Sequence, residues 1–263
     1  MRGKDRVTAL RAEREAVLEF FGGLSPQEWA APSGCEGWTV KDVLAHMAAA
    51  FHGCFTPWFI GLMRTENVER SSDRDVAKRA GWAPEKVLAE YRFWSARYLD
   101  IQPVMKATGL NRVKIPLGEL GRYPMGIFPA AFTFDHHTHL RHDVAGALGR
   151  TPPPTDENRM AVAMEWMIAG IPQMCRETMR TIDGAVDLIL NGPGGGTWGL
   201  SPAPPGTLRI HPGGAPGADA LIIGNTDDFV LWGTTREPWR EHEVKIDGDI
   251  DLGTRFLDAL NVV

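Results

Sequence analysis

The stretch FDHHTHLRHDVAGALGRTPPPT, residues 134–155, contains two signals that decide the architecture of this chain. Four of the eight histidines fall within residues 136–142, in a run without helix breakers. This run predicts a helix from about Pro129 to Gly149, with Gly149 as the C′ glycine that ends it. Three consecutive prolines follow, and they cannot continue a helix. The stretch therefore predicts the end of a helical region and a linker near residue 150.

The sequence before this linker predicts helices. Apolar residues recur at helical spacing over residues 4–21. Thr39 and Asp42 form a capping-box pattern at the start of a second helix. A third helix is predicted over residues 83–101, with Pro84 in its first turn. Together with the histidine-rich helix, these segments predict a four-helix bundle.

The sequence after the linker has a different pattern. One helix is predicted over residues 155–182, capped by Thr155 and interrupted at Pro172, and another over residues 251–262. The glycine-rich segment 191–199 lacks the Lys-Ser/Thr pair of a phosphate loop and is predicted to be a hairpin turn. Short alternating segments predict strands at residues 185–190, 197–201, 207–211, 219–224 and 242–247. The predicted class is α+β, with a helical bundle at residues 1–150 and a small domain with a mainly antiparallel sheet at residues 151–263.

Composition excludes some classes of function. The net charge of −5 and the pI near 5.9 disfavour a nucleic-acid partner, which normally needs a basic face. Three cysteines do not make a disulfide framework. The chain starts without an apolar signal segment and has no apolar run of about 18 residues, so we expect a soluble cytoplasmic protein without a membrane partner.

The histidine-rich helix also predicts a metal site. Asp135 and His139 are four residues apart and share one helix face, and Asp143 continues this row. A carboxylate and an imidazole that point into a bundle form half of a site for a divalent metal such as Zn²⁺. His46, within the apolar segment VLAHMAAAF, is the natural third ligand.

Other interpretations of these histidines stay open. A single histidine on an apolar helix is often a hydrogen-bonded core residue, and a histidine-rich helix can be a solvated surface. A second register would place His136 and Leu140 in the ligand positions. Leucine cannot bind a metal, so we prefer the register that uses Asp135 and His139.

The segment CEGWTVKDVLAHMAA, residues 35–49, resembles the N-terminal signature of the mycothiol-dependent maleylpyruvate isomerase family, a branch of the DinB-like metal-binding bundles. The resemblance implies metal ligands at His46, Asp135 and His139. The segments LILNGPGGGTWGLSP and VKIDGDIDLGTRFLDALNV look like the family's sterol-carrier-protein-like C-terminal domain. Two departures stand out: Asp135 replaces the glutamate of the characterised isomerase type, and Asp143 follows the ligand histidine one position later than is most common.

The resemblance implies a reaction class. Mycothiol or a similar low-molecular-weight thiol would bind the metal as a thiolate and add to an electrophilic small molecule, in an isomerisation or an S-transfer. His142 or Asp143 would handle protons or support His139. Arg236 and Arg240 would hold the substrate or the thiol cofactor through carboxylate hydrogen bonds, unless they are solvated surface residues.

The rival hypothesis is a non-catalytic small-molecule-binding or regulatory protein. Cys35 is expected to be a packed structural thiol.

Overall fold

The computed structural model describes residues 5–56, 68–204 and 206–262. The chain divides into two compact units, Gly3–Thr155 and Asp156–Val263. The proline run at residues 152–154 ends one residue before the division. Each unit has its own buried core.

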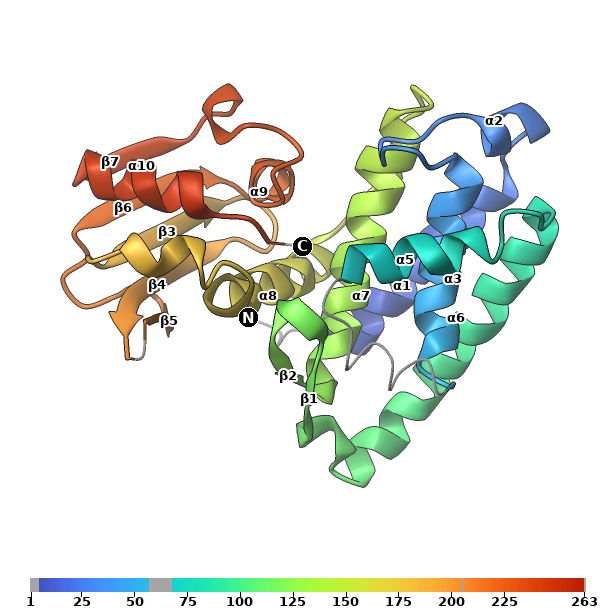
Figure 1. The fold of residues 1–263 in the computed structure, drawn as a ribbon, viewed down its shortest axis with the longest axis horizontal. Coiled ribbons are helices and arrows are strands. Elements are labelled where there is room, and N and C mark those ends of the chain that lie inside the picture. Colours follow the sequence, from blue (N-terminus) through green and yellow to red (C-terminus); the bar gives the residue numbers. More distant parts are fainter. Residues whose placement is uncertain (1–4, 57–67, 205, 263) are drawn as a thin grey trace. The chain divides into compact units, whose positions relative to one another are not determined.

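Four long helices build the described part of the first unit (Figure 1). They are α1 (Arg6–Gly22), α3 (Val40–Gly53), α6 (Pro84–Ala107) and α7 (Phe128–Thr138). α3 packs on α6, and α1 packs on both α6 and α7, so apolar side chains from all four helices meet in one core. Shorter elements complete the unit: α2 (Pro26–Ala30), α5 (Val68–Ala77), η1 (Leu110–Arg112), β1 (Lys114–Pro116), η2 (Gly118–Leu120), β2 (Arg122–Pro124) and η3 (Met125–Ile127).

The predicted signals at the starts of two helices are confirmed. The Thr39 hydroxyl accepts a hydrogen bond from the Asp42 backbone N–H, and the Asp42 carboxylate accepts one from the Thr39 backbone N–H. This capping box satisfies two of the amides that the first turn of α3 leaves without helical partners. Pro84 occupies the first position of α6, where its missing N–H costs nothing.

The histidine-rich helix changes its geometry halfway along. α7 ends at Thr138, and a π-helix, η4 (His139–Gly146), continues in the same direction. The predicted single helix is therefore an α-helix followed by a π-helix. Gly149 has a φ of 61°, and the N–H of Arg150 donates to the carbonyl of Ala145 over 3.0 Å. This is a Schellman ending, so the prediction of Gly149 as the C′ glycine is confirmed.

The second unit starts with α8 (Glu157–Met174), and two details of the predicted helix were wrong. The N-cap is Asp156 rather than Thr155, because the Asp156 side chain accepts from the backbone N–H of Arg159. Pro172 does not interrupt the helix. It lies inside the last turn, where its missing N–H removes a single hydrogen bond before the helix ends.

A five-stranded sheet follows, in the order β5-β4-β3-β6-β7. β3 and β6 run parallel and every other neighbouring pair is antiparallel, which confirms the predicted α+β class with a mainly antiparallel sheet. The strands are β3 (Val186–Asn191), β4 (Gly196–Ala203), β5 (Thr207–Pro212), β6 (Ala220–Asn225) and β7 (Lys245–Gly248).

Helices cover one face of this sheet. α10 (Ile250–Ala259) approaches β7 so closely that a Cβ on Gly253 would lie 2.4 Å from Ile246. α9 (Thr226–Trp232) was not predicted, since seven residues are too few to show helical periodicity. The glycine-rich segment is the predicted hairpin turn between β3 and β4. A Cβ on Gly194 would lie 2.2 Å from the backbone nitrogen of Ala161 in α8, which explains why a residue without a side chain stands there.

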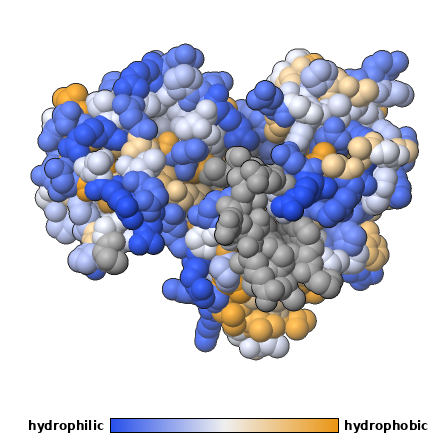
Figure 2. Space-filling model, viewed as in Figure 1, coloured by the Kyte–Doolittle hydropathy of each residue, from blue (hydrophilic) through white to orange (hydrophobic). Residues whose placement is uncertain are grey.

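Val104, near the C-terminal end of α6, and Leu110 and Val113, which follow this helix in the chain, are exposed apolar residues. Figure 2 shows apolar areas scattered over a mostly hydrophilic surface. Within the described ranges, no helix combines the length and the apolar character needed to cross a membrane.

Candidate metal centre

Three side chains from two neighbouring helices and the π-helix converge in the first unit. His46 lies in the middle of α3, Asp135 lies in α7, and His139 is the first residue of η4. Their ligand atoms all lie within 4.8 Å of one another. The Nε2 atoms of His46 and His139 lie 3.2 Å and 3.5 Å from the Asp135 Oδ1 atom.

These separations match what a metal ion requires. Zinc bonds of about 2.0–2.2 Å at tetrahedral angles place a nitrogen and an oxygen ligand about 3.4 Å apart. Two imidazoles and one carboxylate also form a donor set that zinc accepts, with further positions open to other ligands. The three residues therefore fit a divalent metal.

Electrostatics keep the carboxylate ready to bind a cation. Burial favours the neutral form of Asp135, but the neighbouring charge of His139, the close approach of His136 and a hydrogen bond from His46 outweigh it, and the pKa of Asp135 lies well below its usual value. Burial acts to lower the pKa of His139, but the carboxylates of Asp135 and Asp143 prevail and raise it to about 10.

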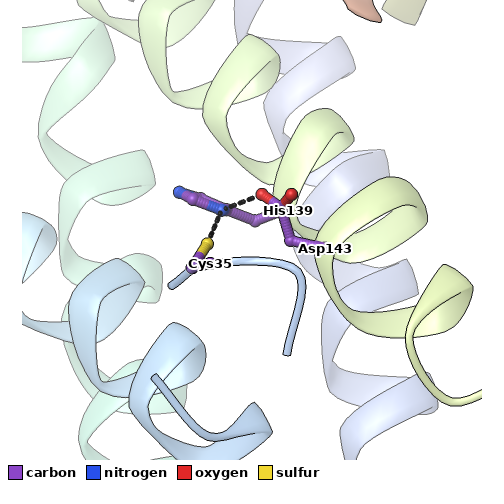
Figure 3. A group of neighbouring side chains, drawn as sticks. All are labelled: Cys35, His139 and Asp143. Atoms are coloured by element: carbon purple, nitrogen blue, oxygen red, sulfur yellow. Dashed lines mark hydrogen bonds and ion pairs between the residues drawn. The ribbon is translucent and has the colours of Figure 1, made fainter. Parts of the chain in front are cut away.

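Asp143 fixes the orientation of the His139 ring (Figure 3). Its Oδ2 atom lies 2.7 Å from Nδ1 of His139, a hydrogen-bond distance. An N–H on Nδ1 leaves the Nε2 lone pair free to face Asp135 and His46. Carboxylates orient metal-binding histidines in this way.

Cys35 lies on the same side of the ring as Asp143 (Figure 3). Its Sγ atom is 3.7 Å from Nδ1 of His139, a contact that sequence reasoning missed because the two residues are 104 positions apart. The loop that holds Cys35 packs tightly on the π-helix: the Gly34 N–H donates to the Asp143 carbonyl over 2.7 Å, and a Cβ on Gly34 would lie 2.9 Å from the Asp143 Cα atom. Cys35, His139 and Asp143 form a second group with metal-ligand atoms. The short distance between His139 and Asp143 indicates that a proton joins these two residues.

The other histidines of the run are not a solvated face. His136 and His137 are buried, and so is Leu140. His137 lies 3.6 Å from Glu13 of α1, and the His142 ring lies 6.1 Å from the His137 ring. Asp135 and His139 face His46, whereas Leu140, the position that the alternative register would use, belongs to the core.

The two predicted arginines belong to the second unit. Arg240 forms a bidentate ion pair with Asp258, with N–O distances of 2.7 Å and 3.0 Å, and lies over the ring of Trp239. Arg236 follows α9, and its backbone N–H donates to the carbonyl of Leu231. Both side chains are exposed.

Comparisons with known proteins agree with this description of the first unit. Residues 10–100 match the family model described as mycothiol maleylpyruvate isomerase N-terminal domain, which confirms the resemblance predicted from the sequence over this part. Curated protein sequences gave no significant match.

Two solved structures have a similar fold. They are the mycothiol-dependent maleylpyruvate isomerase and a variant of it with one histidine replaced by alanine. The TM-score is 0.56 for both, the identities are 16% and 15%, and the matches cover 93% of this chain and 93% of theirs. At this identity the likeness describes the fold, and it extends over both units.

Proposed function

We propose that this chain, whose residues 10–100 match the N-terminal domain of the mycothiol maleylpyruvate isomerase family, is a metal-dependent enzyme that uses a low-molecular-weight thiol. His46, Asp135 and His139 would hold the metal, most simply Zn²⁺. The observation that carries this proposal is the pair of 3.2 Å and 3.5 Å separations around Asp135 Oδ1, which suit a tetrahedral cation.

A bound divalent metal would supply a Lewis acid that lowers the pKa of a thiol, so that the thiol reacts as a thiolate at neutral pH. The chain's own residues have separate tasks. Asp143 holds the Nδ1 proton of His139 and fixes its ring. Trp38, whose ring lies 5.3 Å from that of His46, packs beside the second imidazole.

The proposed reaction is addition of the thiolate, from mycothiol or a similar thiol, to an electrophilic carbon of a small molecule. Expulsion of the thiol after rotation about the former double bond gives an isomerase, and its retention gives an S-transferase. The family match favours the isomerase. We further propose the second unit as the sterol-carrier-protein-like domain, with Arg236 as its candidate for binding a substrate carboxylate. Arg240, which forms an ion pair with Asp258, is a second candidate.

The first test is metal content. We expect about one zinc ion per purified chain and none after the substitution His46→Ala, because that change removes one of three protein ligands. His52→Ala is a matched control, since His52 lies on the same helix but pairs with Glu90, and it should retain the metal. Zinc retained by His46→Ala would refute the assignment.

The second test separates an enzyme from a binding protein. Mycothiol binding, measured by calorimetry with and without a chelator, should require the metal. Turnover of maleylpyruvate distinguishes isomerisation, which regenerates the thiol, from S-transfer, which consumes it. Thiol binding that is indifferent to the chelator would favour the non-catalytic alternative.

A further inference from the structure

His136 lies against the candidate metal centre but does not belong to its ligand set. Its Nδ1 atom is 3.3 Å from Oδ2 of Asp135, whereas the other carboxylate oxygen, Oδ1, faces His46 and His139. The His136 side chain has 0% exposure, compared with 24% for Asp135. The two oxygens of one carboxylate therefore have different neighbours.

The surroundings of His136 are aromatic. Its ring lies 5.2 Å from the Phe51 ring and 5.6 Å from the Tyr91 ring, measured between centroids. Within the described part of the chain, neither ring nitrogen of His136 has a hydrogen-bond partner of good geometry, and the same holds for Oδ2 of Asp135. Buried polar atoms normally have partners, so the close approach of Nδ1 and Oδ2 calls for an explanation.

A small adjustment would join these two atoms. An N–H on Nδ1 donates to a carboxylate oxygen at about 2.7–2.9 Å, only a few tenths of an ångström from the observed separation. The contact would satisfy both atoms and restrict rotation of the carboxylate. In metal sites, ligating carboxylates are themselves held by such hydrogen bonds.

We propose that His136 is a positioning residue for Asp135, which it holds through Oδ2 so that Oδ1 stays directed at the position of the metal. This inference rests on the proposed metal centre at His46, Asp135 and His139. It assigns a specific role to a histidine that helical spacing alone would turn away from the ligands. The competing explanation is that His136 only fills space between Phe51 and Tyr91.

A series of variants at one position distinguishes positioning from packing. His136→Phe keeps an aromatic ring but removes the donor, and it should weaken Co²⁺ and Zn²⁺ binding about 10–100-fold. His136→Asn carries its amide nitrogen at the same number of bonds from Cβ as Nδ1, and it should restore affinity to within a few fold of the wild type. His136→Gln carries the same amide one bond farther out and should not. The Asn and Gln pair keeps the test decisive if the Phe variant does not fold.

Phe132→Leu serves as the packing control. Phe132 lies on the same helix, with its ring 6.5 Å from that of His136 and 4.5 Å from that of Phe51, and it offers no polar atom. The substitution Phe132→Leu should lower the melting temperature of the metal-free chain and leave its metal affinity unchanged.

The measurements are Co²⁺ titration followed by visible absorption, competition with Zn²⁺, and circular dichroism of each metal-free variant. An altered Co²⁺ spectrum in the Phe and Gln variants, restored in the Asn variant, supports the inference. Equal affinity in all folded variants overturns it and leaves the metal centre intact. Absence of Co²⁺ binding in the wild-type chain overturns the proposed metal centre and this inference together.

Discussion

At the scale of single residues, Asp143 governs how His139 is presented. Its Oδ2 atom lies 2.7 Å from Nδ1 of His139, so it sets both the tautomer and the ring angle. We expect Asp143→Ala to weaken zinc affinity about 10–100-fold without removing the site, as is typical for such partners. Asp143→Asn keeps an oxygen acceptor, so its loss of zinc affinity should be smaller. Competition against a chromophoric chelator measures both, and unchanged affinity in the alanine variant would contradict the orienting role.

Glu13 gives the chain a pH-dependent part of its stability. Burial acts to raise its pKa, but the close approach of the His137 ring and the charges of Arg141 and His137 outweigh it, so the pKa is lowered. A carboxylate with a lowered folded-state pKa adds stability above its unfolded pKa of about 4.3, and this stability is lost as the pH falls through the folded-state value.

We expect the wild type to have a higher free energy of unfolding than Glu13→Gln. This difference should be largest at neutral pH and should shrink as the pH falls below about 4.3. Urea unfolding at a series of pH values measures it. Glu15→Gln, on the exposed side of the same helix, should leave the pH profile of the wild type unchanged. A constant difference between wild type and Glu13→Gln down to about pH 3 would refute this role of Glu13.

Sequence reasoning could find some of these residues and not others. His46, Asp135 and His139 could be found from the sequence, because each lies in a helical pattern that indicates which face of the helix its side chain occupies. Cys35 could not, since its approach to His139 depends on how a loop packs on a distant helix. The burial of His136 was also beyond prediction, because it depends on aromatic rings contributed by α3 and α6.

At the scale of elements, the π-helix lies at the place where the sequence departs from the pattern that it resembles. Asp143 follows His139 by four positions, one more than is most common in the family that the sequence resembles. A π-helix holds one residue more per turn than an α-helix and often arises at functional sites. Within η4, Asp143 reaches His139, as residues four apart also do on an α-helix.

Deletion of His142 tests whether the metal centre needs the π geometry of η4. The chain would read His-Leu-Arg-Asp, and in an α-helix residues three apart still share a face. We expect the shortened segment to become α-helical and to keep zinc affinity within about tenfold, a smaller loss than that of Asp143→Ala. A crystal structure and a zinc titration would check both points, and loss of the metal would show that the π geometry itself is required.

Periodicity predicted most of the elements, including the bundle helices and the five strands, but not the change from α- to π-helix. Over the eight residues of η4, apolar positions cannot distinguish the two periods. The tight contact of Gly34 with the backbone of Asp143 accompanies the π-helix and links residues far apart in sequence. Local patterns therefore predict where elements lie, whereas long-range packing sets their finer geometry.

At the scale of the whole molecule, every proposed metal ligand belongs to the first unit, and the division falls after Thr155. A ligand that binds only the folded state stabilises the part of the chain that holds it. At a free zinc concentration of about 100 times Kd, this amounts to about 2.7 kcal/mol. For a domain of about 150 residues, it corresponds to a rise in Tm of roughly 5–11 °C.

We therefore expect calorimetry of the metal-free chain to show two transitions, of which zinc raises one and leaves the other unchanged. His46→Ala should abolish the shift without altering the insensitive transition, because the second unit contains none of the three ligands. The two units would then be energetically separate, with metal binding coupled to the bundle alone. A single transition that moves as a whole on zinc addition would show instead that the units unfold together, so that metal binding stabilises the sheet as well.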